Sequence, residues 1–98
     1  MNNDNNKLKD ITNNFIDISR ELVVKHYNEV LKQDNLSTID TTYIQTVWVC
    51  KSLKNVKGLF CINRKNSGYY EVTYNGEEHE IYLDSYKKID NIKVNIKL

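Results

Sequence analysis

The hydrophobic residues of this chain change their spacing once, near residue 42, and that change constrains the fold more than any other feature. Before it, Leu8, Ile11, Phe15, Ile18 and Leu22 recur in steps of three and four, the spacing of one helix face. After it, strand-forming residues occur in short runs separated by turn residues. We therefore expect an α+β fold, with one N-terminal amphipathic helix packed on an antiparallel meander sheet of four to five strands.

The boundaries of these elements follow from the same pattern. Residues 1–6 are polar and are expected to form a frayed tail, so that residues 7–98 make a single domain. The helix is expected over about residues 8–33, ending at Asp34-Asn35. The sheet is expected over about residues 43–97, with strands near 43–54, 58–63, 69–75, 78–85 and 92–97.

The last expected strand has two different sides. Ile92, Val94 and Ile96 alternate with polar residues, two of which are Lys93 and Lys97. This alternation is typical of a half-buried edge strand whose outer side is protected by lysines.

The dipeptide Asn75-Gly76 predicts a tight hairpin, because Asn and Gly accept the positive φ angles of a two-residue type I′ turn. In that register Glu71 lies opposite Glu80, and Tyr69 lies opposite Tyr82. Tyr70 would pair with Ile81, and Val72 with His79. Strand alternation then places one set of residues on the core face: Tyr70, Val72, Tyr74, His79, Ile81 and Leu83. The opposite face would carry Tyr69, Glu71, Thr73, Glu78, Glu80, Tyr82 and Asp84.

The first hairpin has two candidate registers. Asn55-Val56-Lys57-Gly58 suits a type I turn followed by a glycine bulge, which places Cys50 opposite Arg64. A two-residue turn at Asn55-Val56 would instead place Cys50 opposite Cys61. The positions of Asn and Gly favour the first register, in which the two sulfur atoms stay apart.

Composition excludes some classes of function. The formal net charge is +1, from 14 basic and 13 acidic residues, so we expect neither a strong duplex-DNA binder nor an acidic DNA mimic. No apolar run has the length of a membrane span, and the first residues lack the pattern of a signal peptide. We therefore expect a cytoplasmic protein with no membrane partner and with reduced cysteines.

The residue types that bind metals or perform catalysis occur singly. Cys50, Cys61, His26 and His79 form none of the closely spaced pairs that structural zinc sites use. The three glycines all lie at expected turns, so there is no glycine-rich phosphate loop. We expect no metal, no cofactor and no catalytic residue, and hence no enzyme activity.

Two surfaces are candidates for binding. The first is the face away from the core, where tyrosines could anchor a protein partner and carboxylates select a basic one; it comprises Tyr69, Glu71, Glu78, Glu80, Tyr82 and Asp84. The second combines basic and aromatic residues that would suit nucleotides or single-stranded nucleic acid; it comprises Lys51, Lys54, Lys57, Arg64, Lys65 and Tyr70. Each surface also has a simpler interpretation. The first would be an ordinary solvated sheet face, and the lysines of the second would keep edge strands from pairing with other molecules.

Several segments resemble a family of small uncharacterised proteins from phages and prophages of Gram-positive bacteria. The similar residues are Val47-Trp48, Cys50-Lys51, Leu53 and Asn55, then residues 68–76, 80–84 and 86–88. The resemblance covers about residues 47–88 and implies a phage origin and expression inside an infected host. No catalytic role comes with it.

From these observations we expect a non-enzymatic phage accessory protein that binds and modulates a host protein, with a component of antiviral defence as the candidate target. A protein that binds a nucleotide signal or single-stranded nucleic acid is the first alternative. A structural homo-oligomer, in which the helix stripe forms a homodimer, is the second.

Overall fold

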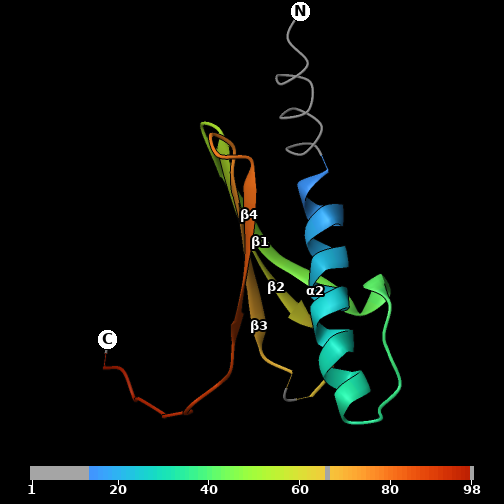
Figure 1. The fold of residues 1–98 in the computed structure, drawn as a ribbon. Helices are drawn as coiled ribbons and strands as arrows, with labels where there is room; N and C mark the ends of the chain where they lie inside the picture. The colour runs from blue at the N-terminus through green and yellow to red at the C-terminus, as the bar shows by residue number, and fades with distance from the viewer. Residues whose placement is uncertain (1–13, 66, 98) are drawn as a thin grey trace, which may run out of the picture.

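The computed structural model of the chain describes residues 14–65 and 67–97. Within this part the chain forms one α-helix, one short 3-10 helix and four strands, shown in Figure 1. In order they are α2 (Phe15–Gln33), η1 (Thr41–Tyr43), β1 (Ile44–Ser52), β2 (Asn55–Ile62), β3 (Tyr69–Asn75) and β4 (Glu80–Tyr86). The four strands pair antiparallel in the order β1-β2-β3-β4, so the predicted α+β meander is confirmed.

The helix ends where its sequence predicts. Asn35 adopts a φ of 58° just after the helix, and its N–H donates to the carbonyl of Lys32. The N–H of Leu36 donates to the carbonyl of Leu31, which completes a Schellman cap. The predicted first turns, residues 8–13, lie outside the described residues. In the part of the chain that is described, no helix has the length and apolarity needed to cross a membrane.

One face of α2 packs on the sheet. Its buried residues are Phe15, Ser19, Val23 and Leu31. The Phe15 ring lies 6.3 Å from the Phe60 ring on β2, centroid to centroid. The sheet side of the core comprises Ile44, Val56, Phe60, Ile62, Tyr70, Val72 and Tyr74. The described part of the stripe considered for a homodimer therefore packs on the chain's own sheet.

The register predicted for the β3–β4 hairpin is wrong. Asn75 pairs with Glu80 rather than starting a two-residue turn, and residues 76–79 form a longer loop. The Asn75 Oδ1 accepts hydrogen bonds from the backbone N–H groups of Glu77 and Glu78, at 3.1 and 3.3 Å. His79 closes the loop with a φ of 53°, so neither it nor Glu78 is a strand residue. Asparagine thus contributes its side chain to the loop rather than a type I′ backbone.

The faces of these two strands are nevertheless as predicted. Tyr69 lies opposite Tyr86 instead of Tyr82, and Glu71 lies opposite Asp84 instead of Glu80. Each partner is displaced by four residues, and an even displacement leaves every side chain on its original side.

Both registers considered for the first hairpin are also wrong. Ser52 pairs with Asn55, so the turn consists of Leu53 and Lys54, with Leu53 at a φ of 55°. Cys50 consequently lies opposite Lys57, and both cysteines are free thiols. This turn contains no residue that favours positive φ, so the hydrophobic contacts of β2 decide the register.

The fifth strand, predicted at residues 92–97, does not form. After Tyr86 the chain leaves the sheet as an extended segment (Figure 1). Ile92, Val94 and Ile96 are exposed.

Candidate functional site

Among the described residues, only one side of the sheet is covered by other elements of the chain. Figure 1 shows α2 and η1 on a single side of it. We call the other side the outer face. Strand alternation and the observed pairing assign its residues: Gln45, Trp48, Cys50, Ser52, Asn55, Lys57, Leu59, Cys61, Tyr69, Glu71, Thr73, Asn75, Glu80, Tyr82, Asp84 and Tyr86.

Trp48 reaches the outer face because of a β-bulge. Thr46 pairs with Phe60 on the helix side, and the next pair is Trp48 with Leu59, so Val47 is an extra residue. Regular alternation from Thr46 would have placed Trp48 on the helix side. The sequence does not predict Trp48 as a residue of this face, because no turn residue or glycine marks the bulge.

Aromatic side chains are concentrated on the outer face. Trp48, Tyr69, Tyr82 and Tyr86 are each between 41% and 50% exposed. The two tyrosines predicted to pair, Tyr69 and Tyr82, lie on adjacent strands but oppose Tyr86 and Thr73 respectively. The structure thus keeps both predicted anchors on one surface and adds Trp48 and Tyr86 to it.

The charged residues of the outer face have different surroundings. The Lys57 ammonium lies 3.4 Å from the Glu71 carboxylate, an ion pair between β2 and β3. On β4, the Tyr82 hydroxyl donates a hydrogen bond to Glu80. That bond, with the negative charges of Glu80 and Glu78, raises the pKa of the Tyr82 phenol. Glu80 and Asp84 make no ion pair with any described residue, so β4 presents unneutralised carboxylates.

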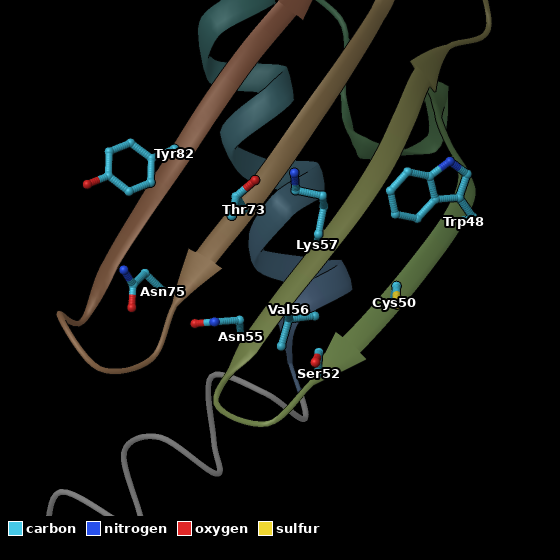
Figure 2. Close-up of a pocket in the computed structure, with 9 residues that line it drawn as sticks. All are labelled: Trp48, Cys50, Ser52, Asn55, Val56, Lys57, Thr73, Asn75 and Tyr82. Atoms are coloured by element: carbon cyan, nitrogen blue, oxygen red, sulfur yellow. The ribbon is translucent and has the colours of Figure 1, made fainter.

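A hollow lies on the outer face toward the end of the sheet that carries the β1–β2 and β3–β4 turns, shown in Figure 2. Its volume is about 460 Å³. Trp48 on β1 and Tyr82 on β4 stand at opposite sides, with Lys57 and Thr73 between them. The complete lining is Trp48, Cys50, Ser52, Asn55, Val56, Lys57, Thr73, Asn75 and Tyr82. Two aromatic walls and an ammonium group would suit a partner that inserts an apolar or aromatic side chain.

The basic residues chosen from the sequence do not form one patch. Lys51 and Lys54 lie at the β1–β2 turn, whereas Arg64 and Lys65 follow the other end of β2. The eight residues of β2 span seven steps of about 3.3 Å, which separates these ends by roughly 23 Å. Tyr70 is buried under α2, where its hydroxyl lies 3.1 Å from His26 Nδ1. Its ring is therefore unavailable for stacking on a base.

Arg64 instead takes part in a second cavity, at the end of the sheet where β2 and β4 finish and β3 begins. Its guanidinium lies 5.3 Å from the centre of the Tyr43 ring, a cation–π contact. Lys87 and Lys88 line the same cavity, which has a volume of about 620 Å³. The other lining residues are Cys61, Ile62, Ser67, Gly68 and Tyr69.

Gly68 determines the shape of this second cavity. It has a φ of 74°, and a Cβ there would lie 2.3 Å from the Tyr86 carbonyl oxygen. Only glycine fits this close approach between the start of β3 and the end of β4. The three cations could not be associated from the sequence, because Arg64 is more than twenty residues from Lys87 and Lys88 and only the β3–β4 pairing joins them.

Histidine and cysteine side chains do not converge. In the described residues there is no group of three or more His, Cys, Asp or Glu residues that could hold a metal ion. The Cys61 thiol donates to Gln45 Oε1 at 3.8 Å. Burial raises the pKa of the Tyr70 phenol, and nearby Tyr27 adds to that rise.

A sequence profile of the "Family of unknown function (DUF6275)" matches residues 16–96, which include α2 and all four strands. No curated protein and no solved structure matches the chain.

Proposed function

We propose that this chain, which belongs to the family of unknown function DUF6275, is a non-enzymatic phage accessory protein. In this proposal it binds and modulates a host protein through its outer face. A component of antiviral defence is the candidate target. The observation that carries the proposal is the group of four exposed aromatic side chains, Trp48, Tyr69, Tyr82 and Tyr86, on one side of the sheet.

The composition of this surface favours a protein partner. Tryptophan and tyrosine are enriched among the residues that dominate binding energy at protein interfaces, because they bury a large area with few rotatable bonds. Trp48 and Tyr82 flank a hollow that an inserted side chain would fill. Glu80 and Asp84 lie along the β4 edge without cationic partners among the described residues. The complementary surface would therefore have an apolar centre and basic residues at its rim.

The surroundings of Cys50 support a non-enzymatic function. Cys50 is the exposed thiol of the hollow. The described residues of the outer face include no histidine that could act as its general base.

The test is affinity capture from host lysate with three forms of the chain. Trp48→Ala/Tyr82→Ala removes both walls of the hollow. Ile16→Ala/Val30→Ala is the matched control, because it removes two side chains of similar exposure on α2. We expect the wild type and the control to retain the same protein and the outer-face variant to lose it. Retention by all three, with unchanged circular dichroism, would refute a docking role for this face.

A second function is favoured by the cavity around Arg64. Three cations and Tyr69 surround a space large enough for a nucleotide, with phosphate contacts and a ring for stacking. This retains the predicted role of Arg64 alone, and Lys87, Lys88 and Tyr69 take the place of the other predicted residues, Lys51, Lys54, Lys57, Lys65 and Tyr70. The test is titration with cyclic nucleotides and short oligonucleotides at two salt concentrations. Binding that weakens with salt and is lost in Arg64→Ala/Lys88→Ala would support it, and no binding at low salt would exclude it.

A further inference from the structure

The segment after β4 exposes an unusual amount of aliphatic surface. Residues 87–97 are extended and form no strand. Ile89 is 98% exposed, and Ile92, Val94 and Ile96 are each 73–77% exposed. Isolated exposed aliphatic side chains are ordinary, but Ile92, Val94 and Ile96 alternate along one side of the extended segment and form an apolar strip of the kind that marks an interaction site.

This segment has the two-sided pattern of a β-strand. In an extended chain Ile92, Val94 and Ile96 point to one side, and Lys93 and Lys97 point to the other. The strip is therefore a strand with one apolar side and one basic side, and it has no partner strand among the described residues.

The free edge of β4 complements both sides of this strip at once. β4 is the last strand of the sheet, so one row of its backbone N–H and C=O groups has no strand partner within the described chain. On the helix side, Ile81 is exposed and Leu83 only partly buried. On the outer face, Glu80 and Asp84 carry negative charge. A strand placed here could set its aliphatic side chains beside Ile81 and Leu83 and its lysines beside the two carboxylates.

The other free edge lacks this complementarity. β1 contains no acidic residue, and its one charged residue is Lys51. A basic strand on that edge would gain no opposite charge and would meet a like one.

The segment does not reach the β4 edge of its own molecule. Figure 1 shows it continuing past the end of β4 and bending away from the sheet. No residue in 87–97 has the positive φ that a tight return turn uses. A second copy of the chain offers the same edge without requiring a reversal. We propose that residues 92–97 of one copy add as a strand to the β4 edge of another, reciprocally, to form a two-fold dimer.

A charge exchange tests this arrangement. The first variant, Lys93→Glu/Lys97→Glu, has an acidic segment facing an acidic edge. The second, Glu80→Lys/Asp84→Lys, has a basic segment facing a basic edge. The proposed dimer has two equivalent contacts between a segment and an edge, and each variant turns two pairs of opposite charges into pairs of like charges in each contact. We therefore expect each variant alone to raise the dimer dissociation constant at least about ten-fold.

Mixing the two variants is the decisive measurement. In a mixed dimer each segment meets an edge of opposite charge, so sedimentation velocity should show a dimer at concentrations where either variant alone is a monomer. Lys51→Glu/Lys54→Glu is the control for a general effect of charge, and we expect it to dimerise like the wild type.

Three results would overturn the proposal. The first is a wild-type chain that stays a monomer at all concentrations. The second is a dimer that neither variant weakens. The third is a pair of weakened variants that do not combine when mixed. If the wild type is a monomer whose residues 92–97 are protected from hydrogen exchange, the segment pairs with its own β4, and dimerisation through it is excluded.

Discussion

Ser19 offers the sharpest test of how the core is held together. It lies on the buried side of α2, between Phe15 and Val23, and is completely inaccessible to solvent. Its Oγ has no hydrogen-bond partner among the described residues. A buried hydroxyl left in this state loses its bonds to water without replacement, at a cost of about 1–3 kcal/mol in folding free energy.

We therefore expect Ser19→Ala to stabilise the protein. Alanine also favours the helix interior over serine by about 0.5 kcal/mol. Removing the oxygen atom also leaves a small cavity, and a cavity the size of a methyl group lowers the free energy of unfolding by about 1 kcal/mol. The net gain in the free energy of unfolding should be about 1 kcal/mol, which corresponds to a Tm increase of roughly 4–8 °C for a domain of this size.

Urea unfolding followed by far-UV circular dichroism measures this gain. The midpoint should rise with an unchanged m-value. Tyr74→Phe is an independent check, because the Tyr74 hydroxyl is also buried without a partner but lies on β3, where helix propensity plays no part. If either substitution lowers the midpoint, its hydroxyl forms a bond in solution, to a buried water for example, and the reasoning fails for that residue.

Three further predictions concern the backbone and the pH dependence of stability. Gly68→Ala should lower the free energy of unfolding by at least about 2 kcal/mol, because its Cβ would collide with the Tyr86 carbonyl at a positive φ; an unchanged urea midpoint would contradict this. Leu53→Gly should raise the free energy of unfolding by up to about 1 kcal/mol, since leucine holds a φ of 55° in an exposed turn; a lower urea midpoint would count against this strain. Burial raises the pKa of Tyr70, so its contribution to stability is complete below the unfolded value of about 10 and is lost as pH rises through the folded pKa. As pH rises above about 10, the wild type should therefore lose more stability than Tyr70→Phe, and parallel losses would exclude this effect of burial.

The periodicity of the sequence was sufficient to predict the helix, the four strands that form and the faces of β3 and β4, but it also predicted a strand at residues 92–97 that does not form. The helix ends at Gln33 because Asp34-Asn35 can form the cap, and the side of each residue on β3 follows from strict alternation. Tyr69 and Tyr82 were placed on the outer face even though their predicted pairing was wrong. An even displacement along a strand changes the partner and keeps the side.

Local sequence patterns did not predict the strand registers correctly. The dipeptide Asn75-Gly76 suits a tight turn, yet Asn75 pairs with Glu80. Leu53 and Lys54 suit no tight turn, yet they form one. The conformational preference of a turn dipeptide is worth about 1 kcal/mol, whereas burying Val56 and Phe60 in the core contributes several. Burial of these two side chains therefore decides the register of the first hairpin.

For the outer face and the second cavity, too, the sequence determined some features and the tertiary structure the others. Sequence alone determined that aromatic and acidic residues would share one face of a sheet, because a period of two requires it. Only the tertiary structure decided which side α2 covers, that a bulge at Val47 turns Trp48 outward, and that Arg64 lines the same cavity as Lys87 and Lys88. Each of these depends on contacts between residues far apart in the chain. Local periodicity carries no information about such contacts, because the free energy that selects them comes from burial in the assembled core.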